Sequence, residues 1–461
     1  MRRSVVTVIL GVTLVVVGGL AFWLLPRMTG WQPFWARPAT PVPAAPPAIP
    51  AAESPQSSGP AMLVSTAKIT PAQVEAAWEP LAAVAQEGGW TAWTTVADAN
   101  TGDVVFESDS RAHTPASLLK VLTAYTALSV LDPTDRLTTG VSQSGDQLYL
   151  WGQGDLLLSA GKGDSSATNG HAGLADLANK VSQNLQDPSA AFTLNYQTKL
   201  FADDVRRPGV LEQNKARWIG EIGPFAIDTG RVDPDEYYYY YDNSPGRVAE
   251  VFAALLEDQG IRIGQTVGFN GVVPEDSTVV GEVQSATVAE QVRVMLEVSD
   301  NTLAEQYCHL AASRYEGAPA DSDSSRQVVK DILQLSDIDT QGLVMADCSG
   351  LDDNTKVAAS TLLQTLQASL RPGAQAASLT RFLPIGGMSG TLKERFQEGA
   401  ALGNLVGKTG ALGQVSSLVG IGTTESGQHL YIVVGVDDVP DDGAWEIRPY
   451  VDDFVVRVLE N

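Results

Sequence analysis

The pattern of hydrophobic and polar positions predicts helices at both ends of the folded part of the chain, with strands beside them. Thr70-Pro71-Ala72-Gln73 has an N-cap threonine and a glutamine three residues later, which begin a helix that we expect to reach about Gln86. Trp90–Ala97 and Val104–Glu107 are strand-like and are joined by a turn, so they predict a β-hairpin. Residues 444–460 show the spacing of a final amphipathic helix.

A largely buried helix is predicted around residue 120. Thr114 is a good N-cap, and Pro115 suits the first helical position because its missing N–H would have no helical partner there. Apolar residues then recur at mixed three- and four-residue spacing: Leu118, Leu119, Val121, Leu122, Tyr125 and Leu128. Ser117 would lie in the first turn, where its backbone N–H is free to bond an external anion.

Ser117 and Lys120 form a candidate nucleophile and base. They lie three residues apart and therefore share one helix face. A hydroxyl beside an amine in apolar surroundings is activated, because desolvation lowers the lysine pKa and makes the amine a base. We interpret the same Ser-x-x-Lys spacing at Ser65–Lys68 and Ser159–Lys162 as chance. The spacing alone is a weak signal, so the rest of a site has to come from elsewhere in the chain.

The second half of the chain combines helices with late strands. The predicted helices are Pro245–Gln259, Thr287–Val298 and Thr302–Arg314, the last with Asn301 as its N-cap, and the predicted strands are Leu402–Lys408, Val415–Thr423 and His429–Asp437. Together with the early hairpin and the terminal helices, this order fits an α+β fold. In that fold, helices cover both faces of one antiparallel sheet.

Residues 140–243 differ in character from both flanks. Leu148–Gly152 is strand-like, but polar segments rich in glycine, serine and asparagine follow it. The tyrosine run Tyr237–Tyr241 is either an exposed strand or turn, or a platform for a substrate. We interpret this region as an inserted accessory domain, so the main domain is discontinuous, over residues 62–139 and 244–461.

The N-terminal segment has the features of a membrane anchor. Residues 4–25 are 22 residues without a charge, long enough to cross a bilayer, and the two arginines before them predict that residues 1–3 stay in the cytoplasm. A cleaved signal peptide is the alternative, although no small-x-small cleavage site follows. Residues 26–61, rich in proline and alanine, predict an extended linker. We therefore expect a domain held outside the cell membrane, or a secreted domain if the segment is cleaved.

Composition narrows the class of protein. A formal net charge of −24 argues against nucleic-acid binding. The four histidines lack the spacing of a metal site, and no glycine-rich phosphate loop stands between a strand and a helix. Cys308 and Cys348 are the two cysteines, and in an exported domain they are either a disulfide or two buried thiols.

Two further polar motifs occur on elements that would expose them. Ser299-Asp300-Asn301 lies in a helix–helix connection, a suitable place for polar groups on a rigid support, although Ser182-Gln183-Asn184 has a similar form. Lys408-Thr409-Gly410 lies on a predicted strand near a sheet edge. There Gly410 would let a ligand approach the backbone closely.

Together, the Ser117–Lys120 pair, Ser299-x-Asn301 and Lys408-Thr409-Gly410 resemble the three motifs of penicillin-binding proteins and serine β-lactamases, in the same order. Ser117 and Ser299 lie 182 residues apart (299 − 117), with a domain inserted between them. This spacing is similar to that of the D-alanyl-D-alanine carboxypeptidase/endopeptidase family of class C low-molecular-mass penicillin-binding proteins. Three further segments resemble that family: Gly152–Asp155, Asp347–Leu351 and Leu383–Leu392.

The resemblance implies a serine peptidase that acts on peptidoglycan stem peptides ending in D-Ala-D-Ala. Ser117 would attack the penultimate D-Ala carbonyl while neutral Lys120 takes its proton. The backbone N–H groups of Ser117 and Ala411 would form the oxyanion hole. β-Lactam antibiotics would acylate the same serine, and no metal or organic cofactor is implied.

The other motif residues have implied roles in binding and proton transfer. Ser299, with Lys408, would pass a proton to the departing amine, and Asn301 would bond the substrate amide. Lys408 and Thr409 would hold the terminal carboxylate. The family also places the turn that contains Cys348 near the active site, so a Cys308–Cys348 bridge would tie that turn to the helix after Ser299.

Several alternatives stay open at the level of the sequence. One is a β-lactamase or esterase on the same scaffold. Another is a non-catalytic peptidoglycan-binding protein, which the intact motifs argue against. The sequence also does not separate carboxypeptidase from endopeptidase activity, because both cleave next to a D-Ala carbonyl. The insertion is shorter than in the larger family members, and Cys348 stands where we expect a glycine.

Overall fold

The structure is a computed structural model that describes residues 68–202, 206, 208–234, 236, 238–315, 320–440 and 443–461. The predicted anchor and linker, and Tyr237, lie outside these residues. Within them, we find no helix that is both long enough and apolar enough to cross a membrane.

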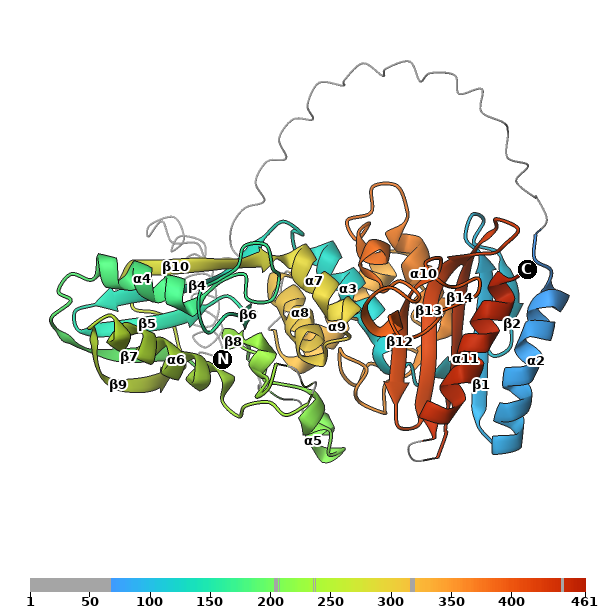
Figure 1. Ribbon diagram of the computed structural model, residues 1–461, viewed down its shortest axis with the longest axis horizontal. Coiled ribbons are helices and arrows are strands. Elements are labelled where there is room, and N and C mark those ends of the chain that lie inside the picture. Colours follow the sequence, from blue (N-terminus) through green and yellow to red (C-terminus); the bar gives the residue numbers. More distant parts are fainter. Residues whose placement is uncertain are drawn as a thin grey trace, which may run out of the picture. The chain divides into compact units, whose positions relative to one another are not determined.

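The main sheet has five strands in the order β12-β13-β14-β1-β2, and each neighbouring pair is antiparallel (Figure 1). Its strands are β1 (Thr91–Asp98), β2 (Val104–Glu107), β12 (Val406–Leu412), β13 (Val415–Thr423) and β14 (His429–Asp437). The predicted hairpin and the last two predicted strands are confirmed. The strand predicted over Leu402–Lys408 begins later, because Gly403 has a φ of 67° and the backbone around it forms turns.

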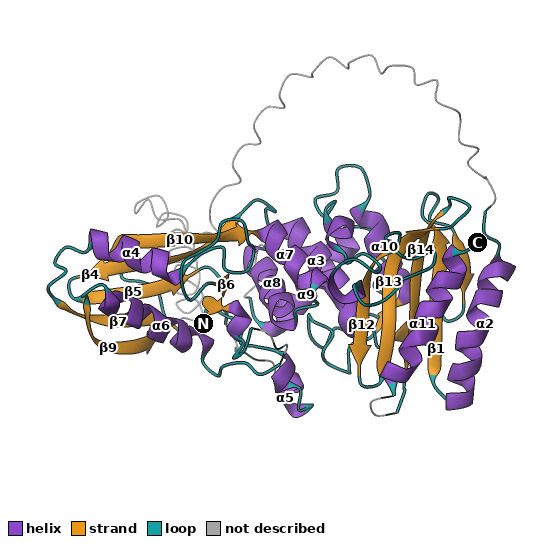
Figure 2. Cartoon of the chain, in the orientation of Figure 1, coloured by secondary structure: helices purple, strands orange, loops and turns teal. Residues whose placement is uncertain are grey.

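Helices cover both faces of this sheet, as predicted for the α+β class. Successive side chains of a strand point to opposite faces. Along β14, successive residues therefore alternate between the two faces. Leu430, Ile432 and Val434 pack with α2 (Pro71–Gly88) and α11 (Ala444–Leu459). Tyr431 and Val433 join the second apolar core, which includes α3 (Leu119–Val130) and α10 (Ala359–Ser369). Figure 2 shows α2 and α11 side by side over the first of these faces.

A group of helices forms the larger apolar core beside the main sheet. Its members are α3, α7 (Val288–Glu297), α8 (Asn301–Arg314), α9 (Ser322–Leu335) and α10. Helix α3 packs against all four of the others. Every residue of α3 from Leu119 to Leu128 is buried, so Lys120 is held inside the protein rather than at its surface.

A second five-stranded sheet has the order β10-β4-β5-β7-β9. Its strands are β4 (Arg136–Ser144), β5 (Gln147–Gly152), β7 (Ala191–Gln197), β9 (Arg262–Phe269) and β10 (Thr278–Thr287). Helices α4 (Leu174–Asn184) and α6 (Ser244–Asp258) pack on this sheet, and their apolar side chains share one core with Leu148 and Leu150. In Figure 1 these elements lie together at the left.

Elements on both sides of the predicted boundary at residue 243 share the second sheet and its core. Helix α6 and strands β9 and β10 belong to the second sheet, so this body extends to Thr287. The amphipathic spacing of α6 correctly predicted one buried face, with Val248, Phe252 and Leu256 at 0% exposure. That spacing carries no information about which of two sheets the face covers, so the sequence alone did not assign α6 to this sheet.

Between β7 and α6 the chain is mostly irregular. The short helix α5 (Pro208–Glu212) is followed by the 3-10 turn η3 (Ala216–Trp218). Strand β8 (Phe225–Ile227) then pairs in parallel with β6 (Asp155–Leu158). We refer to residues 208–241 as the wall segment, because it borders the candidate site described next.

Candidate active site

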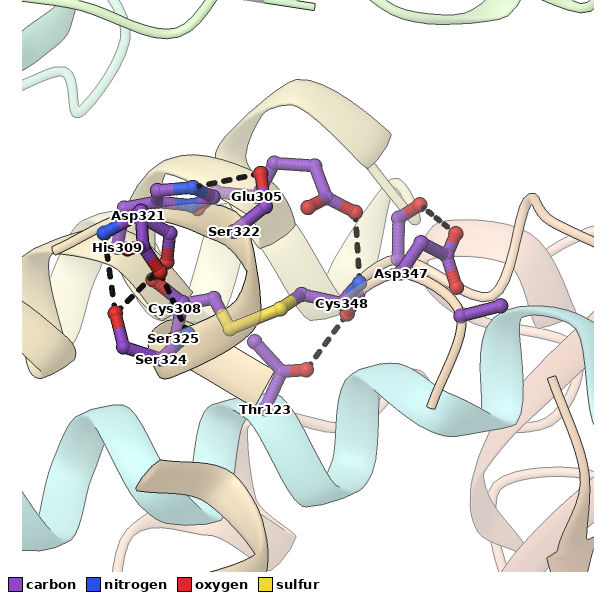
Figure 3. The surroundings of a disulfide bond; sticks show 12 residues. Thr123, Glu305, Cys308, His309, Asp321, Ser322, Ser324, Ser325, Asp347 and Cys348 are labelled. Carbon is purple, nitrogen blue, oxygen red and sulfur yellow. Dashed lines mark hydrogen bonds between the residues drawn. A yellow bond between two sulfur atoms is a disulfide. The ribbon is translucent and has the colours of Figure 1, made fainter. Parts of the chain in front are cut away.

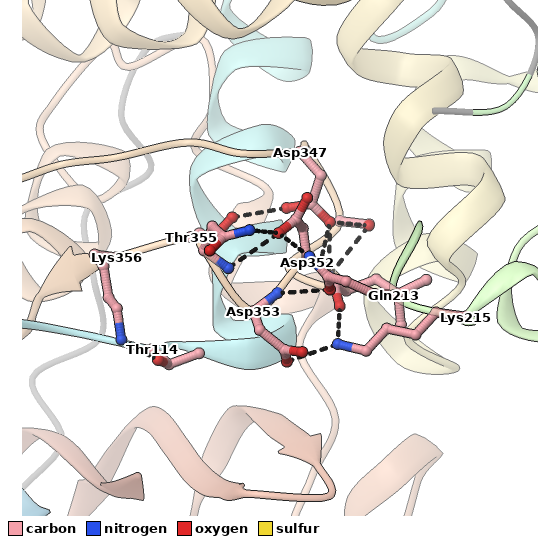
Figure 4. Close-up of polar contacts among 11 residues, drawn as sticks. Thr114, Gln213, Lys215, Asp347, Asp352, Asp353, Thr355 and Lys356 are labelled. Atoms are coloured by element: carbon pink, nitrogen blue, oxygen red, sulfur yellow. Dashed lines mark hydrogen bonds and ion pairs between the residues drawn. The ribbon is translucent and has the colours of Figure 1, made fainter. Parts of the chain in front are cut away.

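The turn that carries Ser117 differs from the predicted helix start. Ala116–Leu118 form a 3-10 turn, η2, and α3 begins after it. Ala116 has a φ of 49°, a left-handed conformation that strains a residue with a Cβ and often marks functional turns. Thr114 does not cap the helix. Its N–H donates to Oδ2 of Asp437 over 3.1 Å, and its hydroxyl accepts a hydrogen bond from Lys356 (Figure 4).

Two glycines leave room for this strained turn. A Cβ on Gly410 would lie 2.5 Å from the carbonyl oxygen of Pro115 and 2.2 Å from Oγ of Ser417. A Cβ on Gly350 would lie 1.9 Å from the carbonyl oxygen of Ala116. Gly410 thus allows the edge strand β12 to approach the reactive turn, whereas the sequence suggested that it made room for a ligand.

Lys120 lies against Ser117 at the start of α3. Its Nζ is 3.0 Å from Oγ of Ser117, and it donates to Oδ1 of Asn301 over 2.6 Å and to the carbonyl oxygen of Ser349 over 2.6 Å. Burial lowers the pKa of Lys120 to about 8, against the opposing effect of three nearby carboxylates. An amine with this pKa is partly neutral at neutral pH and can accept a proton.

The Ser299-Asp300-Asn301 motif lies between α7 and α8. Asp300, rather than the predicted Asn301, is the N-cap of α8, and its Oδ1 accepts from the N–H of Leu303 over 2.9 Å. Ser299 has a φ of 61°, a second strained residue at this site. Asn301 donates from Nδ2 to the carbonyl oxygen of Trp218 over 2.9 Å. Because that oxygen can only accept and Lys120 donates to Oδ1, the orientation of the amide is fixed.

Lys408 lies on the edge strand β12, opposite this loop. Its Nζ donates to Oγ of Ser299 and to the carbonyl oxygen of Thr409, each over 2.8 Å. Burial, with the positive charges of Lys120 and Arg395 as smaller causes, holds the pKa of Lys408 well below its ordinary value. The hydroxyl of Thr409 donates to Oγ1 of Thr391 over 2.8 Å, and Ala411 is exposed further along the strand.

A compact turn beginning at Asp347 supplies one acceptor for Lys120. The carboxylate of Asp347 accepts from the hydroxyl of Ser349 over 2.6 Å, from Oγ1 of Thr355 over 2.9 Å and from the N–H of Leu351 over 2.7 Å. Figure 4 shows Asp347 and Thr355 in this group of contacts, and the Lys215–Asp353 ion pair in the same view. The turn therefore holds the carbonyl of Ser349 toward Lys120.

Cys308 and Cys348, the predicted pair, form a disulfide bond (Figure 3). It joins α8 to the turn that begins at Asp347. The N–H of Cys348 donates to Oε1 of Glu305 over 2.8 Å, and its carbonyl accepts from Oγ1 of Thr123 over 2.6 Å. This region is thus attached to both α3 and α8, the helices that carry Lys120 and Asn301.

A cavity of about 190 Å³ lies beside Ser117. Four of its lining residues are the predicted Ser117, Ser299 and Asn301 with the intervening Asp300. The other three come from the wall segment. Trp218 and Arg231 were not foreseen, whereas Tyr240 belongs to the tyrosine run that the sequence offered as a possible substrate platform. The tyrosine run was the one sequence signal there. Burial raises the pKa of Tyr240 to about 12, while Tyr239 is 57% exposed.

The sheet with helices on both faces, and a serine beside a buried lysine of lowered pKa, define a serine-type hydrolase of the penicillin-binding class. The model of the D-Ala-D-Ala carboxypeptidase 3 (S13) family matches residues 79–238 and 234–457. The chain belongs to this family. In the part of the chain that the structure describes, no group of three or more His, Cys, Asp or Glu side chains is arranged to hold a metal ion.

Two curated relatives extend over most of the chain. Carboxypeptidase DacB of Mycolicibacterium smegmatis is 32% identical over 412 residues, which cover 83% of this chain and 84% of the relative. Carboxypeptidase Rv3627c of Mycobacterium tuberculosis is 31% identical over 355 residues, which cover 73% of this chain and 74% of the relative.

Solved structures share the fold. The crystal structure of penicillin binding protein 4 (dacB) from Haemophilus influenzae has a TM-score of 0.67 and 18% identity, and the match covers 83% of this chain and 99% of that chain. A second structure of that protein, in complex with a β-lactam, has a TM-score of 0.65 and 19% identity. At these identities the similarity concerns the fold.

Proposed function

We propose that this protein removes the terminal D-alanine from peptidoglycan stem peptides through an acyl-enzyme on Ser117. The observation that carries this proposal is the 3.0 Å contact between Oγ of Ser117 and Nζ of a fully buried lysine, at the edge of a cavity. Family membership supports the substrate class.

In the acylation step, the hydrogen-bond partners of Lys120 orient its lone pair. A neutral amine has two N–H donors and one acceptor site. The carbonyl of Ser349 and Oδ1 of Asn301 can only accept, so they take the two N–H groups. The lone pair then points at Ser117, whose hydroxyl proton passes to Lys120 as Oγ attacks the penultimate D-Ala carbonyl. General-base assistance of this kind contributes about 10²–10⁴ in rate.

The developing oxyanion would be held by the backbone N–H groups of Ser117 and Ala411. The packing of the edge strand β12 against the turn η2, which carries Ser117, supports this assignment. Loss of one such donor raises a barrier by about 3 kcal/mol. The second N–H of the Asn301 amide, which does not contact Trp218, is available to bind the substrate backbone.

The remaining motif residues act on the leaving group. Ser299, held by Lys408, gives its hydroxyl proton to the amine nitrogen as the C–N bond breaks, and Lys408 restores it. Thr409 on β12 holds the terminal carboxylate, with the amine of Lys408 behind it. Water then hydrolyses the ester, which releases the shortened peptide and regenerates Ser117.

The location of the enzyme is part of the same proposal. Residues 4–25 would anchor the chain in the cell membrane and residues 26–61 would hold the catalytic domain outside it. Cell fractionation tests this. The protein should stay with membranes after a high-salt wash and should become soluble when residues 1–61 are deleted.

Digestion of purified muropeptides, followed by mass analysis, tests the reaction. Pentapeptides should each lose one alanine, and cleavage of cross-linked dimers would add endopeptidase activity. A fluorescent penicillin should label Ser117, and Ser117→Ala should abolish both labelling and alanine release. Ser159→Ala is the matched control, because Ser159 has the same spacing to a lysine. An adduct on another serine would refute the assignment.

A further inference from the structure

The wall segment contacts both the Ser299-Asp300-Asn301 loop and the start of α8. The carbonyl of Trp218 accepts from Asn301 over 2.9 Å, and the N–H of Gly220 donates to Oγ1 of Thr302 over 2.8 Å. Nη2 of Arg231 donates to Oδ2 of Asp300 over 2.7 Å. One stretch of the inserted region thus binds three consecutive residues of the catalytic loop.

Arg231 makes the charged contact of this set, and it is largely buried. Its side chain is 11% exposed and that of Asp300 is 2% exposed. Burial opposes the arginine charge, yet the carboxylates of Asp300 and Asp228 keep the pKa of Arg231 above its ordinary value. Removing one partner of such a buried ion pair strongly destabilises the folded protein, because the other charge stays buried and unpaired.

Asp300 is the residue through which this contact reaches the active site. One carboxylate oxygen caps α8 through the N–H of Leu303, and the other accepts from Arg231, so the carboxylate is held at both ends. On one side of Asp300 lies Ser299, in a left-handed conformation, and on the other lies Asn301, bonded to Lys120. A strained conformation persists only where its surroundings over-determine it.

We propose that Arg231 is a positioning residue for acyl transfer, acting through Asp300 to hold Ser299 and Asn301 in place beside Lys120. This rests on the proposed function of Ser117. In this view the inserted region is part of the catalytic apparatus, since it supplies one charged support of the loop.

The charges around Lys120 allow this role to be measured through the pKa of Lys120. A residue that only stabilises the fold would not change that pKa. Asp347, Asp300 and Glu305 face Lys120 and raise its pKa, and the amine of Lys408, whose own pKa is lowered by burial, lies on the side of β12. Neutralising Arg231 leaves the charge of Asp300 uncompensated, so the pKa of Lys120 should rise. A rise of one unit in this pKa lowers the neutral fraction of Lys120 at pH 7 about tenfold, and the rate of acylation falls with it.

The test uses the full chain and a fluorescent penicillin, with acylation rates measured across pH and melting temperatures measured for every variant. Arg231→Gln should slow acylation at pH 7 about tenfold and move the acidic limb of the profile upward by about one unit. Arg231→Lys keeps the charge and should leave the limb in place. Arg247→Gln is the matched control, since Arg247 lies in the same region but pairs with Glu250.

A double-mutant comparison ties the effect to Asp300. Asp300→Asn keeps a good N-cap but removes the charge, so its limb should move downward. Because the ion pair is then already broken, adding Arg231→Gln should cause a much smaller loss of rate on the plateau above the limb than it causes in the wild-type background. The proposal is overturned if Arg231→Gln matches wild type in rate and limb, or lowers the plateau rate equally in both backgrounds. If Arg231→Gln does not fold, the proposal is overturned when the acidic limb of the pH profile in Asp300→Asn stays where it is in the wild type. Wild-type protein that takes up no penicillin would instead refute the function of Ser117.

Discussion

Lys120 donates a hydrogen bond from Nζ to Oδ1 of Asn301 over 2.6 Å, although 181 residues separate them in the sequence. This bond joins the first and second motifs directly. Because Trp218 holds the other end of the Asn301 amide, the base, the loop and the wall segment form one hydrogen-bonded chain. If Ser117 is the nucleophile, as we propose, its base is therefore positioned in part by Trp218, which lies far from it in the sequence.

Acylation should follow the titration of Lys120. Its pKa is lowered to about 8, so the protonated form prevails below that pH and the neutral base above it. At pH 7 about a tenth of the protein holds the neutral base, and the rate should rise about tenfold toward pH 9 and then level. Stopped-flow acylation by penicillin checks this. Lys120→Arg, which stays protonated throughout, should lose about 10²–10⁴ in rate at every pH. A wild-type profile without an acidic limb would contradict this role.

Lys408→Ala should slow acylation of Ser117, because Ser299 then loses the lysine that donates a hydrogen bond to its hydroxyl. The structure commits Nζ of Lys408 to Oγ of Ser299 and to a backbone carbonyl, and the side chain is fully buried. Loss of proton transfer to the leaving group should then lower kcat about 10²–10⁴. Substrates with and without a free C-terminal carboxylate separate this role from carboxylate binding. A loss confined to KM of the carboxylate substrates would show that Lys408 only binds.

The sequence located the three motifs because each lies on or beside a strongly patterned element. Ser299 follows α7, whose start has a capping box at Thr287, and Lys408 lies on a strand beside two long apolar strands. The wall segment shows no regular spacing of apolar residues. It contains left-handed residues such as Asn214 and Thr229, and its place is set by contacts with distant residues. Trp218 and Arg231 were therefore beyond a local analysis.

The predicted helix start at Pro115 was wrong for a related reason. Thr114 and Pro115 are good helix-start residues, and no local signal indicates that Ala116 adopts a positive φ. The turn is set by tertiary packing, in which Gly350 and Gly410 allow close approach of two distant segments. Local propensity was overridden by this long-range contact.

Gly410→Ala should destabilise the protein and slow acylation together. The added Cβ would meet the carbonyl of Pro115 at 2.5 Å, so β12 or the reactive turn has to shift. Overpacking of this kind costs about 1–3 kcal/mol. Thermal unfolding and penicillin acylation measure the two effects. Gly271→Ala is the control, since a Cβ there meets nothing within 4 Å. Unchanged acylation in Gly410→Ala would mean that the turn tolerates displacement.

Removal of the Cys308–Cys348 disulfide should lower stability and also slow acylation. The bridge closes a loop with a sequence separation of 40, for which the chain-entropy model gives about 4 kcal/mol. It also ties α8 to the turn whose Ser349 carbonyl accepts from Lys120, so that acceptor should become less well placed.

Cys308→Ala/Cys348→Ala tests both effects by denaturant unfolding and penicillin acylation. The bonds from Cys348 to Glu305 and Thr123 use backbone atoms, which the double variant retains, so the turn should still form. We expect a large loss in unfolding free energy and a smaller loss in acylation rate. The reductant-treated wild type should behave like the variant. If the wild type takes up alkylating reagent on both cysteines after denaturation without reductant, the bridge is absent, and α8 is held to the turn by packing and these hydrogen bonds alone.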